Sequence, residues 1–351
     1  MSLTALPFDA PLSDYEQQAD ALLAGGKADG AVAIDRDDAL LAIARWYEFA
    51  DWRRLAEYVD AVRQPGPVAR FERAVEAVID GDVTTLSALL HEDPEIVRAR
   101  STRVNNFDPP MHRATLLHYL AANGVEGYRQ RSPKNAVEVA RVLLDAGADP
   151  NALSWAYGGQ CTTMALLVSS TPPAQAGVQV PLVETLVKGG ASLEPAGEGN
   201  WTSPLGTALV FGFQATADAL VRLGAKVENV AVAAGLGRMD DVTRLLPSAS
   251  AEDRHRALAL AAQLGHPAIV TLLIDEGEDP NRFNPPGSHA HTPPIHQAIA
   301  ADHLDVVTVL VDKGARLDIK DTIYQSSPLG WAEYLGKHAI ADYLRAHGAP
   351  R

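Results

Sequence analysis

The chain has 351 residues, a formal net charge of -14, and 47% hydrophobic but only 6% aromatic residues. A chain this acidic is a poor ligand for the phosphate backbone of nucleic acids, so we exclude nucleic acid as a partner. Cys161 is the only cysteine, which excludes an intrachain disulfide bond and a metal cluster held by thiolates.

The beginning of the sequence carries no targeting pattern. No basic residue precedes Lys27, and the first residues contain no apolar run long enough for export. No stretch approaches the length of a membrane span. We therefore expect a cytoplasmic protein that does not enter a membrane.

Residues 1–65 do not repeat later in the chain and predict a small helical leader. Apolar residues at helical spacing predict one helix over residues 14–23 and two more within residues 37–62. Pro and Gly at residues 64–67 mark a hinge. The aromatic residues of this region are clustered: Trp46, Tyr47, Phe49 and Trp52. We expect the leader to cap the open end of the structure formed by residues 69–351, and a docking surface is the alternative.

From residue 69 to residue 351, a pattern returns about every 30 to 40 residues, a period typical of stacked repeats. A turn leads into a short Ala-rich helix, Gly or Asp ends it, and a second helix with Val and Leu closes at Gly-Ala. The best copies are residues 114–151, 203–225, 257–281, 292–316 and 327–349. Small residues on the first helix allow close approach, and the apolar stripe of the second is buried against the next unit.

The pattern resembles the ankyrin repeat, most closely in TPPIHQAIAADHLDVVTVLVDKGAR, residues 292–316. Pro294 and His296 stand where that family has the Pro and His of its Thr-Pro-Leu-His turn. Other copies are degraded, with Gly206, Gly330 and Ala259 at the His position.

The resemblance implies an all-α fold, an ankyrin-repeat α-solenoid of about eight helix-turn-helix units with finger loops over residues 69–351. The leader is similar to the short helical leaders found ahead of some bacterial ankyrin arrays. The family also implies a module that binds a protein or peptide partner in the concave groove of fingers and inner helices. Nothing demands an oligomer, so we expect a monomer.

Three segments depart from the repeat, and specificity is sought there because the solenoid supplies shape and its loops supply recognition. The link over residues 99–114 is longer than a plain finger and carries Arg113. An insertion around Tyr128 separates two helices that normally meet in a tight turn. A third departure covers residues 169–181.

The fingers are rich in ring side chains for so aliphatic a chain. Aromatic anchors beside a few polar groups are typical of recognition surfaces. The predicted binding residues are Arg113, Tyr128, Trp155, Tyr157, Trp201, Phe283, His289, His291, Tyr324 and Trp331. The competing interpretation is that each ring covers its own loop.

His289 and His291 lie two residues apart on a finger, where side chains two apart share a side, and His296 follows them. Imidazoles can hold transition metals. However, His296 and His118 occupy the family's structural His position, and no acidic ligand accompanies the pair. We therefore expect no metal site and no cofactor.

The second function class is a small-molecule binder or an unusual enzyme whose pocket the long fingers and insertions close. Its available acids and bases would be His112, His289, His291, Asp108 and Asp321. No catalytic motif is present, so we expect binding rather than catalysis. A shallow, open groove supports a protein partner, whereas a concavity of roughly 300 Å³ or more ringed by these side chains supports the second class.

Overall fold

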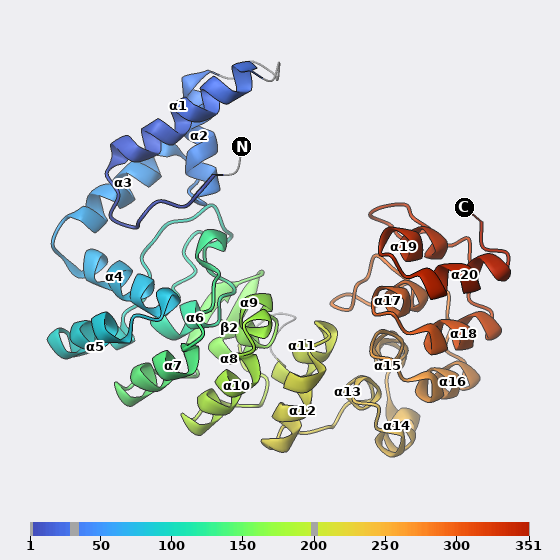
Figure 1. Ribbon diagram of the computed structural model, residues 1–351. Coiled ribbons are helices and arrows are strands. Elements are labelled where there is room, and N and C mark those ends of the chain that lie inside the picture. The colour runs from blue at the N-terminus through green and yellow to red at the C-terminus, as the bar shows by residue number, and fades with distance from the viewer. Residues whose placement is uncertain (1–2, 29–34, 198–202, 351) are drawn as a thin grey trace. The chain divides into compact units, whose positions relative to one another are not determined.

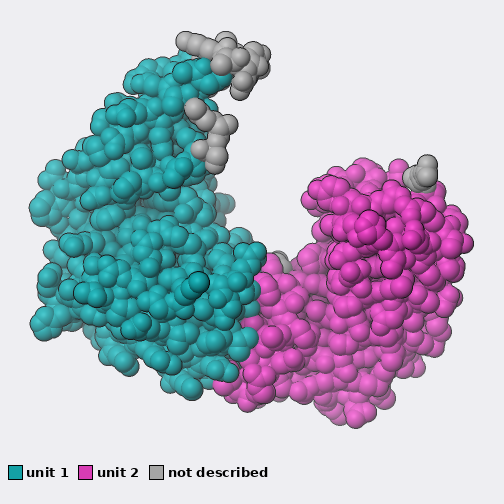
Figure 2. All heavy atoms as spheres, in the orientation of Figure 1, with its two compact units in different colours: residues 1–204 teal, residues 205–351 magenta. Residues whose placement is uncertain are grey.

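The computed structural model describes residues 3–28, 35–197 and 203–350, which form mainly α-helices (Figure 1). The chain divides into two compact units, residues 1–204 and residues 205–351 (Figure 2). No helix among the described residues is both long and apolar enough to cross a lipid bilayer.

The leader consists of three helices, α1 (Leu12–Ala28), α2 (Arg36–Trp46) and α3 (Trp52–Arg63). The side chains of Asp35 and Asp51 cap α2 and α3 by accepting bonds from the backbone of their first turns. A core of its own holds the leader together, built around Tyr15, Ile43, Tyr47 and Leu55.

The first unit continues with paired antiparallel helices. They are α4 (Pro67–Asp80) with α5 (Val83–Glu92), α6 (Leu116–Leu120) with α7 (Ala136–Asp145), and α8 (Thr163–Leu167) with α10 (Gln179–Lys188). Short elements lie between them: η1 (Pro94–Arg98), η2 (Gly127–Arg129) and α9 (Thr171–Gln175). One finger forms an antiparallel hairpin of β1 (Leu153–Ala156) and β2 (Gly159–Thr162).

The second unit repeats the same helix pair. Its members are α11 (Pro204–Val210) with α12 (Gln214–Arg222), α13 (Val230–Gly235) with α14 (Met239–Leu245), α15 (Ala251–Gln263) with α16 (Pro267–Asp275), α17 (Pro294–Ala300) with α18 (Leu304–Asp312), and α19 (Pro328–Tyr334) with α20 (His338–Ala346). The 3₁₀ turn η3 (Leu246–Ser248) follows α14. Eight pairs are thus seen in the described parts of the chain, which confirms the expected fold and number of repeats.

A recurring Asp-Pro-Asn turn ties successive repeats together. Asn151 donates from Nδ2 to the carbonyl of Gly190 at 2.9 Å, and its Oδ1 accepts from the amide of Ser192 at 2.8 Å. Asn281 bonds to Gly314 and Arg316 in the same way, at 3.1 and 2.7 Å. Each Asn side chain therefore forms hydrogen bonds with backbone groups just after the next outer helix, where hydrogen-bond partners within the helix are lacking.

Candidate binding surfaces

A row of rings lies on the fingers and inner helices of the last two repeats, and we call it the C-terminal ring surface. It comprises the rings of His289, His291, Tyr324, Trp331 and Tyr334, together with the aliphatic side chain of Leu335. Ring centroids are 6.2 Å apart between His289 and His291, 6.2 Å between His291 and Trp331, and 6.3 Å between Tyr324 and Trp331. The structure thus brings together four of the predicted binding residues.

Asp321 fixes the finger that carries this surface. Its carboxylate accepts bonds from the amides of Ile323, Tyr324 and Ser326 at 2.9, 2.6 and 3.0 Å, and from the indole of Trp331 at 3.0 Å. Burial opposes ionisation of Asp321, but these donors lower its pKa to about 2. Asp321 is therefore committed to holding the finger and Trp331, and it is not a free acid or base.

A hollow of about 540 Å³ is lined by Tyr324, Ser326, Trp331, Tyr334 and Leu335. Its walls remain in contact with solvent, since Tyr324 is 70% exposed and Tyr334 is 90% exposed. Large apolar side chains gathered at the surface in this way usually mark an interaction site. The hollow is an open groove and not an enclosed pocket.

The two finger histidines are held by local contacts. His289 adopts a φ of 58°, and its Nε2 lies 3.2 Å from the carbonyl of Val210. Burial lowers the pKa of His289, which keeps the ring neutral at physiological pH. The carbonyl of His291 accepts from the amide of Thr322 at 2.9 Å, which joins this finger to the next.

Three other histidines are structural and bond to the following finger. Nε2 of His118 lies 3.4 Å from the carbonyl of Cys161, and Nε2 of His296 lies 3.2 Å from that of Ser326. His255 makes the equivalent contact to Phe283 at 3.1 Å. His255 makes this contact from a position one turn before Ala259, the residue that the repeat pattern aligns with the His, within the longer helix α15.

Lowering the pH from 7.5 to 5 is expected to destabilise both units through these histidines. Burial lowers the pKa of His118 to about 3 and that of His296 to about 4, whereas an unfolded imidazole titrates near pH 6.5. The stabilisation is therefore complete above pH 6.5 and is lost as the pH falls toward the folded pKa. At pH 5, His118 and His296 each lower the free energy of unfolding by on the order of 2 kcal/mol.

Denaturant unfolding at the two pH values measures this effect, with His296→Gln as the matched variant that keeps a hydrogen-bond donor. The variant should lose less stability than the wild type between pH 7.5 and pH 5. Equal losses in the two proteins would contradict the assignment.

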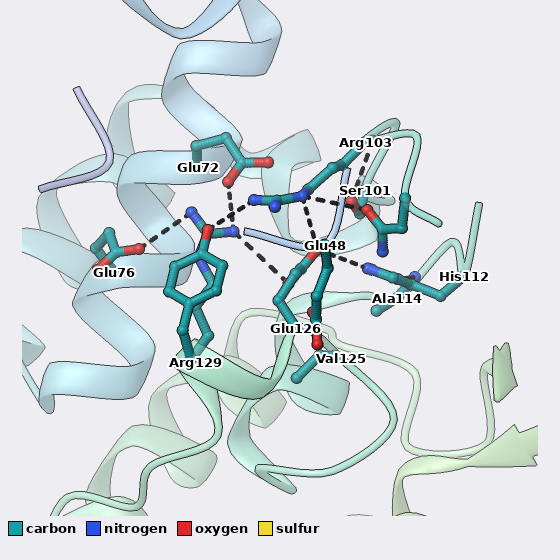
Figure 3. A network of polar contacts seen from close by, with 12 residues as sticks. Glu48, Glu72, Glu76, Ser101, Arg103, His112, Ala114, Val125, Glu126 and Arg129 are labelled. Carbon is teal, nitrogen blue, oxygen red and sulfur yellow. Dashed lines mark hydrogen bonds and ion pairs between the residues drawn. The ribbon is translucent and has the colours of Figure 1, made fainter. Parts of the chain in front are cut away.

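A network of buried charges joins the leader to the first repeats (Figure 3). Glu126, in the insertion after α6, lies at its centre and is fully buried. Its Oε1 lies 3.3 Å from Nε of Arg103 and 3.0 Å from Nε2 of His112. Nδ1 of His112 accepts from the amide of Ala114 at 3.0 Å, so Nε2 carries the proton that it donates to Glu126.

Arg129 connects this network to α4. Its Nη1 lies 2.8 Å from Oε2 of Glu72, and its Nη2 lies 3.1 Å from Oε1 of Glu76 (Figure 3). Tyr58 of the leader donates to Glu72 at 2.9 Å. The two buried cations, Arg103 and Arg129, are thus balanced by the buried carboxylates of Glu126 and Glu72.

Residues of the leader pack against this network. Arg103 donates to the carbonyl of Tyr47 and, at 2.7 Å, to the hydroxyl of Tyr128. Its guanidinium lies 4.0 Å from the ring centre of Phe49, a favourable cation–π contact. Burial opposes ionisation of Glu126, yet the charge of Arg103 and the bond from His112 hold its pKa well below the ordinary value.

The remaining predicted site residues lie in different surroundings. Tyr128 is half-buried against Trp46 and Tyr47 of the leader, and Arg113 is exposed on its finger. Phe283 is half-buried, and its carbonyl accepts the bond from His255. Trp201 lies outside the described residues.

Trp155 and Tyr157 lie on the β1–β2 hairpin, and with Asp108 they line a second hollow, of about 400 Å³. This hollow belongs to the first unit, whereas the C-terminal ring surface belongs to the second. Six of the ten predicted binding residues therefore fall into two local groups.

The candidate acids and bases do not converge on one reaction centre. His112 is buried beside Glu126, Asp321 holds its finger, and His289 and His291 line neither of the two hollows. Asp108 lines the second hollow. Burial raises the pKa of the Cys161 thiol, which disfavours the reactive thiolate. Within the described ranges, no group of three or more His, Cys, Asp or Glu is placed to hold a metal ion.

Family models and known proteins are consistent with this architecture. The model described as ankyrin repeats in three copies matches residues 230–321 and 258–350, and that of the single ankyrin repeat matches residues 112–155.

Among similar proteins, cyclin-dependent kinase inhibitor 2A of Homo sapiens is 34% identical over 122 residues, covering 33% of this chain and 75% of that protein. Cyclin-dependent kinase 4 inhibitor B of Homo sapiens is 32% identical over 127 residues, covering 35% of this chain and 88% of that protein. The ankyrin repeat and KH domain-containing protein mask-1 of Caenorhabditis elegans is 28% identical over 220 residues, covering 60% of this chain and 8% of that protein. These relatives are eukaryotic, so they lend no support to a bacterial origin. The repeated helix pairs, the structural histidines and these similarities together show that the chain belongs to the ankyrin-repeat family.

Proposed function

We propose that this interaction module binds a protein or peptide partner through its C-terminal ring surface. The observation that supports the proposal is the group of exposed rings around the 540 Å³ groove, with Tyr324 70% and Tyr334 90% exposed. Aromatic side chains contribute large contact areas with few rotatable bonds, which makes them frequent anchors of interfaces.

A folded protein or an extended peptide suits this surface better than a small substrate. Both hollows exceed roughly 300 Å³, the size that would suit a small molecule, but exposed rings border them and the candidate acids and bases are dispersed. Only Asp108 of those acids and bases lines either hollow. The alternative of a small-molecule binder or an unusual enzyme therefore gains no support.

The partner that we propose is a protein and not a nucleic acid, since the net charge of -14 opposes binding to phosphates. Two relatives are named as inhibitors of cyclin-dependent kinases, so protein kinases are among the partners to be tested. We further propose that the chain acts as a monomer in the cytoplasm, where a single free thiol such as Cys161 stays reduced.

Replacing Tyr334 with alanine is expected to weaken partner binding by about 2 kcal/mol, because a buried aromatic anchor contributes that much to an interface. Its side chain is 90% exposed in the free protein, so folding should be unaffected. Affinity capture with mass spectrometry identifies the partner, and titration calorimetry then measures its Kd for each variant.

Asp312→Ala, on outer helix α18, serves as the control that should leave the Kd unchanged. If the Kd of Tyr334→Ala and of Tyr324→Ala equalled that of the wild type, the ring surface would not be the binding site.

A further inference from the structure

The second hollow, which we call the leader hollow, combines aromatic walls with carboxylates. Phe107, Trp155 and Tyr157 supply the rings, and Glu48 and Asp108 supply the acids. No lysine or arginine is among the residues that line it. Its volume of about 400 Å³ is large enough to admit a side chain of another molecule.

Four segments distant in the sequence build this hollow: Glu48, residues 107–109, residues 124–130 and residues 155–158. Glu48 lies in the turn between α2 and α3, where its carbonyl accepts from the amide of Asn106 at 2.8 Å. The amide of Trp155 donates to the carbonyl of His112 at 2.7 Å, which joins the hairpin to the long link that carries Asp108. These bonds hold the carboxylates and the rings in place before any ligand arrives.

The tip of the hairpin is shaped to present Tyr157. Tyr157 and Gly158 have φ values of 54° and 76°, as a tight two-residue hairpin turn requires. The Tyr157 hydroxyl donates to the side-chain oxygen of Asn123, which orients the ring, yet the side chain is 62% exposed. The ring is therefore both fixed and accessible.

In the parts of the chain that the structure describes, the carboxylates of the leader hollow are not ion-paired with a lysine or arginine. Both oxygens of Glu48 accept from the amide of Gly127, at 3.1 and 3.0 Å. Burial raises the pKa of Glu48, and the bond from Gly127 and the charge of Arg103 oppose that rise. Within the described residues, neither Glu48 nor Asp108 forms an ion pair with a lysine or arginine. The nearby Arg103 is buried and already paired with Glu126.

We propose that the leader hollow binds the cationic end of a lysine or arginine side chain of a partner protein. The ring faces attract a cation, the carboxylates compensate its charge, and the apolar walls accept its aliphatic stem. This site lies in the first unit and is distinct from the C-terminal ring surface. One part of this proposal rests on the proposed function, namely that the cationic side chain belongs to a protein.

The test is a titration of the 15N-labelled full chain with capped peptides of sequence Gly-Gly-Lys-Gly-Gly and Gly-Gly-Arg-Gly-Gly. The amide resonances of Gly124, Gly127 and Gly158 report on the hollow. A peptide with norleucine at the central position keeps the aliphatic stem but lacks the charge. We expect saturable shifts with at least one cationic peptide and none with norleucine.

Asp108→Asn should weaken this binding by about 3-fold to 30-fold, as should Trp155→Leu. Asp108 is exposed, so its substitution does not threaten folding, and Asp145→Asn on the outer helix α7 is the matched control. Equal shifts with norleucine, or unchanged affinity in Asp108→Asn, would overturn the proposal.

Spermidine distinguishes the two sources of the cation. Weaker binding of spermidine than of the peptides supports a partner protein. Tighter binding of spermidine would overturn the assignment to a protein side chain. None of these outcomes depends on Tyr334, so failure here and failure of the proposed function are separable.

Discussion

Glu126→Gln is expected to destabilise the first unit by about 3 to 5 kcal/mol, although it changes neither the size nor the shape of the side chain. Glu126 is fully buried and lies against Arg103, with its other oxygen 3.8 Å from Arg129. Removing its charge leaves two buried cations with only Glu72 as a fully buried counterion. The cost comes mainly from these uncompensated charges, because desolvated ions are expensive without partners.

Urea denaturation monitored by tryptophan fluorescence measures this loss, since Trp46 and Trp52 pack against the leader core. Glu138→Gln on the exposed side of α7 makes the same chemical change without burial, and should cost less than about 0.5 kcal/mol. A loss below about 1 kcal/mol for Glu126→Gln would show that the network contributes little to joining the leader and the repeats.

Deleting residues 327–351 is expected to destabilise the second unit by roughly 5 kcal/mol or more and to cause aggregation. The deletion removes the buried side chains of Leu329, Ile340 and Leu344, each contributing roughly 1.5 to 3 kcal/mol. It also uncovers α17 and α18, against which α19 and α20 pack. In a repeat protein the terminal unit shields the apolar face of its neighbour.

Size-exclusion chromatography and thermal unfolding of the truncated chain test this expectation. Leu329→Ala in the full chain is a milder variant, with an expected cost of about 2 to 5 kcal/mol. A truncated protein that stays monomeric and as stable as the full chain would contradict the account of the last repeat as a cap.

The helix pairs could be predicted from the sequence because each repeat carries its own local pattern. The Pro, Ala and Gly positions recur, and burial follows the apolar spacing of the outer helices, as for Val306 and Leu310. Where the pattern was degraded the prediction was less accurate. His255 was missed because the sequence gives no boundary for the longer helix α15.

Contacts between distant segments could not be predicted. In the sequence, Glu126 and Arg129 have the pattern of ordinary charged surface residues. Only the fold places them beside Arg103 and Glu72. The inserted segment itself was identified as unusual, but its Tyr128 faces the leader. The inter-repeat bonds of Asn151 and Asn281 were also not anticipated, since their partners lie in the following repeat.

The candidate surface was predicted in part. The finger position of Tyr324 and the inner-helix position of Trp331 placed both on one surface, as the repeat geometry implied. Tyr334 and Leu335 were missed, because a tyrosine and a leucine at the end of a short helix form no distinguishing sequence pattern. The exposure that makes them informative is visible only in the folded chain.

Site-specific photo-crosslinking tests the central claim most directly. Benzoylphenylalanine replaces Tyr334 in one variant and Asp312 in another, so the reactive group lies on an inner or an outer helix of the second unit. After irradiation in native extract, we predict a covalent protein adduct from position 334 and none from position 312. An adduct from position 312 alone would contradict binding at the C-terminal ring surface.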